Sequence, residues 1–401
     1  MAAVPLHAVQ TPSKVLLPGF VRKAVPIFFV VMHGFLAHSG AMNSFVVILR
    51  NAIDAHNRAV LESNDQTSVT LPFHITTLDA RNHGLSPHTS THSSENLVED
   101  LSHYLEHDFP RTVSRVSEAW MRDSSDHSHG DVGCPRVVAI GHSMGSITWT
   151  QYLMDRYLPS LANTGKIQRP ELSSTTATSP SNNVSASAQP SLDVKGLVSL
   201  DLPPIVRSNM TAKLTGELIG IIEHMKVVNL SAISDLRSGH EEFYRCGMHD
   251  IRVRGLCTTN LALQRDPNDP TRRVASWKCN VPVLEHSIRS GELFLPDSYY
   301  KPAAGGKGSG GTRDSQEQKQ RRHRLALEYP TVGTVPVLSV LGDASPVGGD
   351  LQYQQLWERY AVDLRQHSIP HATHTVYFDK PHETVELVKN FLKEIHVDQP
   401  L

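Results

Sequence analysis

One stretch of the chain organises the rest: Arg136-Val137-Val138-Ala139-Ile140-Gly141-His142-Ser143-Met144-Gly145. Its four consecutive apolar residues, rich in β-branched side chains, predict a short buried strand. Apolar side chains then recur at helical spacing between Ile147 and Leu153. A strand that turns sharply into a helix on Gly-x-Ser-x-Gly is typical of a nucleophile elbow, in which the serine hydroxyl stands clear of the sheet.

Small residues flank the serine of this motif for a steric reason. The serine sits in a strained turn, so Gly141 and Gly145 must let the neighbouring backbones pass. The helix that follows directs its N-terminal amides and the positive end of its dipole at the reaction centre. Ser143 is therefore the candidate nucleophile, and the flanking strand and helix add specificity to a pattern that is weak by itself.

The composition limits the classes of protein to consider. The chain has 401 residues, enough for one large α/β domain with insertions or for two smaller domains. Hydrophobic residues make up 39%, a low share that indicates segments outside the core. A formal net charge of -2 offers no basic field to nucleic acid or to a membrane surface. Four cysteines without a Cys-x-x-Cys pair predict buried thiols in a reducing compartment.

Strands and helices are predicted to alternate along the chain. The expected strands cover residues 27–32, 73–78, 137–140, 194–200, 335–341 and 363–369, with chain needed for the first strands from near Leu6. The expected helices of the core cover residues 42–57, 95–107, 351–360 and 381–395. This alternation predicts an α/β fold with a mostly parallel central sheet and helices on both faces. The longest apolar run, at residues 25–32, is too short to span a bilayer.

A helical insertion is expected between the strands at 194–200 and 335–341. Its helices are predicted at residues 210–228, 241–246, 250–260 and 281–290. An insertion of this kind forms a lid, so we expect a core from residues 1–202, a lid from 203–334 and the rest of the core from 335–401. Three polar segments, near 123–133, 163–191 and 305–324, have too few large apolar side chains to offset the entropy of ordering and are expected to be disordered loops.

The candidate nucleophile needs a base, an acid that orients the base, and donors for an oxyanion. In α/β folds that carry such an elbow, these groups follow in the order serine, acid, histidine, at strand ends. Position selects His374 from the 23 histidines, because it lies just past the end of the last strand and before the last helix. His371 and His382 are nearby alternatives, of which His382 at the start of the helix is badly aimed.

Two carboxylates compete for the role of the acid. The usual position, three residues after Gly342, is Ser345, which holds no charge. Asp343 and Asp350 are close to it but out of register. Asp201 directly follows the preceding strand and can reach the same imidazole. Because a buried strand end is a poor place for an unpaired charge without a function, Asp201 is favoured and Asp343 stays the alternative.

The oxyanion donors are expected to be two backbone N–H groups, those of Met144 and Phe35. Met144 follows the nucleophile, and Phe35 follows His33-Gly34 on the loop where such a fold supplies its second donor. This set of groups needs no cofactor. No metal site is predicted, because the histidines near 123–133 have no acidic or cysteine ligands at a fixed spacing.

Several stretches together resemble a known family. They are Met32-His33-Gly34-Phe35, Asp79-Ala80-Arg81-Asn82-His83-Gly84-Leu85-Ser86, Gly141-His142-Ser143-Met144-Gly145, Val198-Ser199-Leu200-Asp201, Trp277-Lys278-Cys279-Asn280-Val281-Pro282-Val283-Leu284 and Phe378-Asp379-Lys380-Pro381. With them the chain resembles the α/β-hydrolase superfamily and, within it, the serine esterases grouped with bacterial YbfF and the animal abhydrolase domain-containing protein eleven. Departures at Ser146, Thr373 and Thr375, where the family usually has Gly, Gly and Trp, affect the acyl pocket more than the triad.

The resemblance implies an α/β-hydrolase fold with a helical lid inserted after the sixth strand. It also implies a serine hydrolase that cleaves carboxylic esters or thioesters, including acyl and lipid esters, through Ser143, His374 and Asp201 and an acyl-enzyme. The expected partner is a small acyl or lipid ester, with no nucleic acid and no transmembrane segment. The implied location is the mitochondrion, and otherwise the cytoplasm. An acyltransferase or other triad enzyme on the same fold, and a ligand-binding homologue without turnover, stay open as alternatives.

Overall fold

The structure is a computed structural model, and it describes residues 2–17, 24–63, 69–122, 134–163, 192–266, 269, 273–300 and 331–397. The three segments predicted to be disordered loops lie outside these residues, apart from residue 163. The four cysteines form no disulfide with one another. Cys257 and Cys279 are buried, as predicted, whereas Cys134 and Cys246 are only partly buried.

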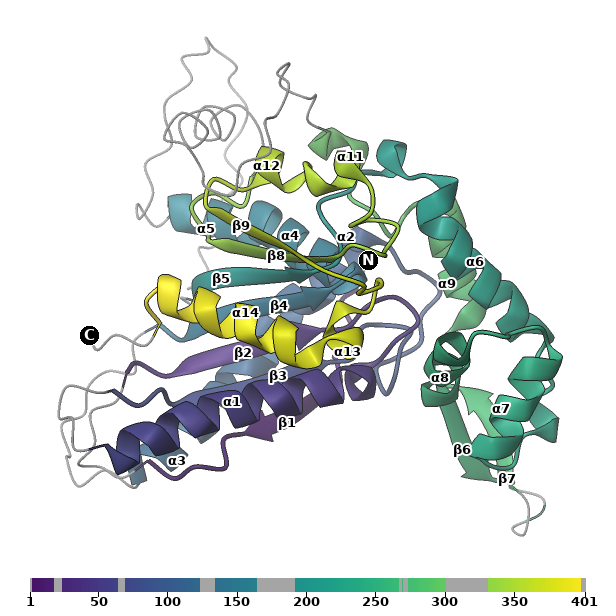
Figure 1. Cartoon of the computed structure of the whole chain (residues 1–401), viewed down its shortest axis with the longest axis horizontal. Coiled ribbons are helices and arrows are strands. Elements are labelled where there is room, and N and C mark those ends of the chain that lie inside the picture. The colour runs from purple at the N-terminus through teal and green to yellow at the C-terminus, as the bar shows by residue number, and fades with distance from the viewer. Residues whose placement is uncertain are drawn as a thin grey trace.

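A seven-stranded sheet forms the centre of the molecule (Figure 1). Across the sheet its strands are β1 (Ala8–Pro12), β3 (Phe73–Leu78), β2 (Ile27–Met32), β4 (Arg136–His142), β5 (Asp193–Leu200), β8 (Val337–Gly342) and β9 (Leu364–Ile369). The edge strand β1 is antiparallel to β3, and the other pairs are parallel. The predicted mostly parallel sheet is confirmed, and the carboxyl ends of β2, β4, β5 and β8 meet at one edge.

Helices cover both faces of the sheet, as predicted. On one face lie α1 (Asn43–Glu62) and α14 (Pro381–Glu394), and on the other α2 (Ser94–His103), α3 (Phe109–Arg122), α4 (Met144–Tyr152) and α5 (Leu158–Asn163). Successive strand side chains point to opposite faces, so β2 sends Phe29 and Val31 to the first layer and Phe28 and Val30 to the second. Burial on both faces explains the continuous apolar strands of the sequence.

Two core helices differ from their predictions. The helix predicted at 95–107 is α2, which continues through a π-helical turn at Tyr104–Asp108 into the unpredicted α3. Pro110 near the start of α3 has no N–H to donate, and the wider turn lies directly before it. The helix predicted at 351–360 is two short helices, α11 (Leu351–Gln354) and α12 (Trp357–Tyr360).

The segment of residues 203–300, which follows β5, lies beside the carboxyl edge of the sheet (Figure 1). It contains α6 (Ala212–Val227), α7 (Leu236–Arg245), α8 (Ile251–Thr259) and α9 (Val281–Ser290), which confirms its four predicted helices. It also contains an unpredicted hairpin of β6 (Leu261–Arg265) and β7 (Arg273–Trp277). Five strands of the sheet precede it in the described part of the chain, one fewer than predicted. We refer to residues 203–300 as the lid.

Within the described ranges, every helix is too short or too polar to cross a bilayer.

Candidate active site

The Gly-x-Ser-x-Gly motif forms the tight turn between β4 and α4. Ser143 has φ 51° and ψ -115°, a backbone conformation that non-glycine residues rarely adopt. A Cβ on Gly145 would lie 2.4 Å from the Met32 carbonyl oxygen, and one on Gly141 would lie 2.4 Å from the backbone of Gly145. Both flanking positions therefore require glycine. Strain of this kind is characteristic of functional residues.

The structure brings Ser143, His374 and Asp201 together from three separate strand ends. Nε2 of His374 lies 2.9 Å from Oγ of Ser143, and Nδ1 of the same ring lies 2.7 Å from Oδ2 of Asp201. Because a carboxylate only accepts, the proton of the neutral ring belongs on Nδ1. Nε2 is then an acceptor for the serine hydroxyl. The Asp201 side chain is fully buried, whereas that of His374 is 25% exposed.

Asp201 is held by more than the imidazole. Its Oδ1 accepts hydrogen bonds from the backbone N–H of Gly342 at 2.6 Å and from the Ser345 hydroxyl at 3.1 Å. Burial raises the pKa of the Asp201 carboxyl above its ordinary value, and the hydrogen bonds from His374 and Gly342 oppose that rise. The residue at the usual acid position, Ser345, thus supports the carboxylate that comes from the neighbouring strand.

The alternative residues lie elsewhere. Asp343 is exposed, and its Oδ1 accepts a hydrogen bond of 2.6 Å from the backbone N–H of His371. Asp350 caps α11 through the backbone N–H of Gln352. The His371 side chain is exposed in a turn, and His382 is exposed on the first turn of α14. Of the candidate acids, Asp201 is therefore the one that contacts His374.

The predicted oxyanion donors lie on the two segments next to the nucleophile. A Cβ on Gly34 would lie 2.4 Å from Nδ1 of His142 and 3.1 Å from Cβ of Ser143, so the loop that carries Phe35 packs directly on the elbow. Met144 begins α4. Among the described residues, no acceptor takes the backbone N–H of Phe35 or of Met144. Two unused donors beside a serine hydroxyl are the arrangement that an oxyanion requires.

His142 is a site residue that the sequence did not single out. Its Nε2 lies 2.8 Å from the backbone carbonyl oxygen of His374, and its ring packs 5.0 Å from that of His374 and 4.7 Å from that of Tyr377. Burial lowers its pKa well below the ordinary value, so the neutral ring donates from Nε2. His142 therefore fixes the loop that carries His374. It occupies a free position of Gly-x-Ser-x-Gly, which explains why the motif gave no signal.

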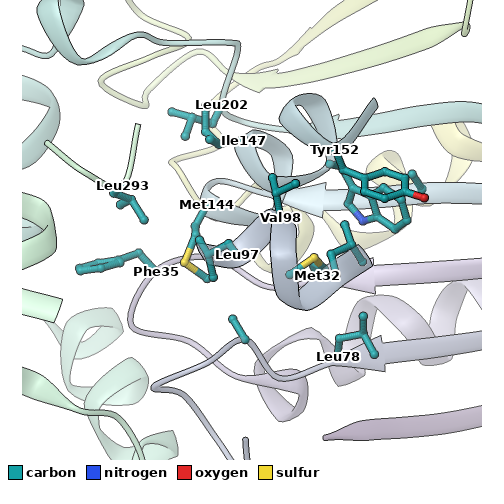
Figure 2. Packing of buried hydrophobic residues seen from close by; sticks show 14 of the residues in the cluster. Met32, Phe35, Leu78, Leu97, Val98, Met144, Ile147, Tyr152, Leu202 and Leu293 are labelled. Carbon is teal, nitrogen blue, oxygen red and sulfur yellow. The ribbon is translucent and has the colours of Figure 1, made fainter. Parts of the chain in front are cut away.

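Apolar side chains of both the core and the lid surround the nucleophile turn. Figure 2 shows Phe35, Leu202 and Leu293 grouped around Met144. All four are at most 5% exposed and belong to one buried cluster. Leu202 follows Asp201, whereas Leu293 follows α9 of the lid. Apolar side chains of the core and the lid therefore pack around the residue that follows the serine.

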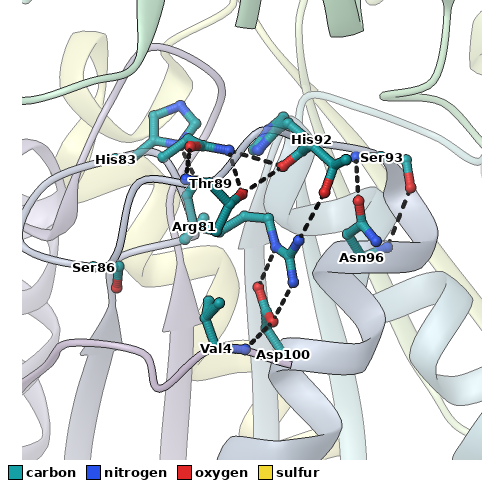
Figure 3. Close-up of polar contacts among 12 residues, drawn as sticks. Val4, Arg81, His83, Ser86, Thr89, His92, Ser93, Asn96 and Asp100 are labelled. Atoms are coloured by element: carbon teal, nitrogen blue, oxygen red, sulfur yellow. Dashed lines mark hydrogen bonds and ion pairs between the residues drawn. The ribbon is translucent and has the colours of Figure 1, made fainter. Parts of the chain in front are cut away.

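The Asp79–Ser86 block packs against the loop after β2 through polar contacts. The Arg81 guanidinium makes two hydrogen bonds of 2.6 Å to the Asp100 carboxylate, which also accepts one of 2.8 Å from the backbone N–H of Val4 (Figure 3). Nε2 of His83 accepts a hydrogen bond of 3.2 Å from the backbone N–H of Leu36. The block thereby joins the N-terminal strand region, α2 and the loop after β2.

Comparison with known proteins adds information on the fold. No family model and no curated protein matches the chain. It is similar to the solved structure of a marine microorganism esterase, with 17% identity and a TM-score of 0.57, over 97% of this chain and 100% of that one. It is also similar to an E-2-(acetamidomethylene)succinate hydrolase, with 14% identity and a TM-score of 0.49, over 96% of this chain and 100% of that one. For MenH from S. aureus the identity is 11% and the TM-score 0.45, over 97% of this chain and 98% of that one. The predicted α/β-hydrolase fold is confirmed.

Proposed function

We propose that the protein is a serine hydrolase that cleaves carboxylic esters or thioesters. The observation that carries this proposal is the continuous contact from Ser143 Oγ through His374 to Asp201, with distances of 2.9 Å and 2.7 Å. The positive φ of Ser143 supports its role as nucleophile. Fold alone does not carry this conclusion, because the same fold serves many reactions.

Acylation begins at the serine hydroxyl. Nε2 of His374 removes the proton as Oγ of Ser143 attacks the carbonyl carbon, and Asp201 stabilises the imidazolium that forms. The carbonyl oxygen becomes an oxyanion that accepts hydrogen bonds from the backbone N–H groups of Phe35 and Met144. One such donor contributes about 2.7–4 kcal/mol of transition-state stabilisation.

The same groups complete acylation and then carry out deacylation. The imidazolium gives its proton to the leaving alcohol or thiol, which departs and leaves an acyl-enzyme. His374 then takes a proton from water, which attacks the acyl carbonyl carbon. Collapse of the second oxyanion breaks the bond to Ser143 Oγ, returns the proton to that oxygen and releases the carboxylic acid.

An acyl or lipid ester suits the surroundings of the serine. The side chains of Phe35, Leu202 and Leu293 are apolar and group around Met144, the residue that follows the nucleophile, so an apolar acyl chain is expected to pack against them. A serine at the elbow argues against epoxide hydrolysis and dehalogenation, which need a carboxylate nucleophile there. The proposal also includes the closer grouping with the YbfF and abhydrolase-eleven esterases and, with it, a mitochondrial location. This grouping is supported by the sequence stretches that resemble the family, in particular Asp79–Ser86.

The test is hydrolysis of p-nitrophenyl esters from acetate to palmitate, together with labelling by a fluorophosphonate. The unchanged protein is expected to turn over part of the series and to be labelled once, and Ser143→Ala is expected to lose both. Ser160→Ala is the matched control, because its hydroxyl only bonds the Tyr157 carbonyl oxygen. Labelling without turnover would favour an acyltransferase or a more specialised substrate. Absence of both would favour a ligand-binding protein.

A further inference from the structure

Leu36 in the loop after β2 has a strained backbone that is held from two sides. It has φ 56° and is fully buried, and a non-glycine residue in this region costs about 1–2 kcal/mol. Its N–H donates to Nε2 of His83 at 3.2 Å. Its carbonyl oxygen accepts a hydrogen bond of 2.6 Å from Nδ2 of Asn260. The first partner belongs to the core, and the second belongs to the lid.

Asn260 is fixed in place by the lid itself. It lies between α8 and β6, is fully buried, and its backbone oxygen accepts a hydrogen bond of 2.7 Å from the N–H of Lys278. Its side-chain nitrogen also lies 3.2 Å from the carbonyl oxygen of Leu256. Because both neighbours of that nitrogen are carbonyl oxygens, the NH₂ group of the amide is the part that faces them. The lid thus extends a donor into the loop beside the nucleophile.

The contact at Leu36 is transmitted to Phe35 through two peptide groups. The described chain has no cis peptide bond, so the C=O and N–H of each peptide group point in opposite directions. The peptide group that Asn260 holds by the Leu36 oxygen carries the Ala37 N–H, which donates to the Gly34 oxygen at 3.1 Å. The peptide group of that Gly34 oxygen carries the Phe35 N–H. Holding Leu36 O therefore helps to orient Phe35 N–H.

The core holds the same Gly34 oxygen from its other side. Nδ1 of His33 lies 2.8 Å from it, while Nε2 of His33 accepts a hydrogen bond of 3.0 Å from the backbone N–H of Ala80. The proton of this ring is therefore on Nδ1, which donates to Gly34. The Gly34 oxygen thus accepts from two donors: the His33 ring, which the core holds, and the Ala37 N–H, whose peptide group Asn260 holds. Hydrogen bonds in such a chain also polarise one another, which strengthens the outward N–H of Phe35 as a donor.

We propose that Asn260 is a positioning residue for the oxyanion site, and that the lid completes this site through its contact with Leu36. The inference rests on the proposed serine hydrolase function. The lid then does more than line the acyl pocket, because its docking against residues 33–37 sets the direction of one oxyanion donor. Removal of the Asn260 donor is expected to weaken transition-state stabilisation while ground-state binding of the ester stays unchanged.

The experiment compares the full-length protein with Asn260→Ala, the isosteric Asn260→Asp and the control Tyr353→Phe. The Tyr353 hydroxyl donates a hydrogen bond to the backbone oxygen of Asn209 in the lid. Tyr353→Phe therefore removes a contact between the core and the lid that does not involve residues 33–37. Each protein is assayed for kcat and KM with a p-nitrophenyl ester and for inhibition by an aryl trifluoromethyl ketone. In this probe Ser143 Oγ adds to the ketone carbon, His374 takes the proton, and the ketone oxygen becomes the oxyanion.

Both Asn260 variants are expected to lose about tenfold or more in kcat with KM unchanged, and to lose ketone affinity by the same factor as kcat/KM. Tyr353→Phe is expected to change neither. The inference is overturned if a folded Asn260 variant keeps kcat and ketone affinity, or if neither variant shows a cooperative melting transition, since Asn260 would then serve the fold. Inactivity of the unchanged protein would instead contradict the proposed function.

Discussion

The Ser345 hydroxyl donates a hydrogen bond of 3.1 Å to Oδ1 of Asp201, and both side chains are buried. The two residues follow neighbouring parallel strands, β5 and β8, which end at the same edge of the sheet. The other oxygen of Asp201 faces His374. An acid after β5 therefore reaches the imidazole, and the residue three positions after Gly342 serves as its donor.

The choice between Asp201 and Asp343 gives the first prediction. Asp201→Asn is expected to lower kcat about 10⁴-fold, the effect of the same change in the Ser-His-Asp template, because the amide favours the wrong tautomer of the imidazole. Asp343→Asn is the matched control and should keep its turnover, since that exposed carboxylate bonds only the His371 N–H. Steady-state rates on one p-nitrophenyl ester check both, and loss of activity in Asp343→Asn alone would reassign the acid.

A second prediction transfers the acid to the neighbouring strand. The double change Asp201→Asn with Ser345→Asp is expected to recover at least about tenfold of the activity lost by Asp201→Asn, because position 345 already lies within hydrogen-bond distance of the Asp201 carboxylate. Ser345→Asp alone should lower the melting temperature, since two buried carboxylates then lie side by side. A double variant no more active than Asp201→Asn would show that position 345 cannot reach His374.

The sequence predicted the parts of the fold that depend on continuous apolar strands. The strand at Ile27–Met32 and the elbow at Ser143 were placed correctly because burial on both faces and tight backbone packing leave a strong local pattern. The hairpin of β6 and β7 was missed, because its strands are short, partly exposed and without clear alternation. Asn260 was missed for another reason: its role depends on a contact with Leu36, which is 224 positions away in the chain.

The candidate site also combines residues that leave a local sequence pattern with residues whose role depends on contacts between distant parts of the chain. Ser143 and His374 could be proposed from motif and chain order. Asp201 could be favoured over Asp343 from its place at a strand end, and its contact with His374 comes from the structure. His142 could not be found, because any residue is allowed at its position of the motif. The catalytic roles themselves stay predictions until the variants are assayed.

A third prediction concerns acid stability and His74 on β3. This side chain is 4% exposed, and burial together with the nearby Arg115 lowers its pKa to about 4. In the unfolded chain the ring has its ordinary pKa, so between about pH 6.5 and 4 the unfolded state binds one proton more. The free energy of unfolding therefore falls as the pH falls through this window. Replacement of His74 removes that dependence.

Urea unfolding at pH 7 and pH 5 measures the effect. From pH 7 to pH 5 the unchanged protein should lose about 2 kcal/mol more unfolding free energy than His74→Gln. Gln10→Ala is the control, because Gln10 accepts the hydrogen bond of His74 at 2.6 Å but does not titrate. It should lower stability by similar amounts at both pH values. Equal losses in the unchanged protein and His74→Gln would contradict the lowered pKa.

The fourth prediction tests the ion pair between Arg81 and Asp100. The side chains of Arg81 and Asp100 are 2% and 1% exposed, so removal of either partner leaves a buried charge without its counter-ion. Arg81→Met and Asp100→Leu are each expected to lower the free energy of unfolding by about 3–5 kcal/mol. The double variant should cost clearly less than the sum of the two, because it leaves no charge behind. Urea unfolding of the four proteins gives this coupling directly.

One asymmetry is expected within this set. Asp100 also accepts the backbone N–H of Val4, so Asp100→Leu loses a further acceptor that costs about 1–3 kcal/mol when the donor stays buried. Asp100→Asn keeps an oxygen for Val4 and should be less harmful than Asp100→Leu. Strict additivity of Arg81→Met and Asp100→Leu would mean that the two groups do not depend on each other. The two hydrogen bonds of 2.6 Å between Arg81 and Asp100 predict instead that the two effects are not additive, because each buried charge is stabilised mainly by the other.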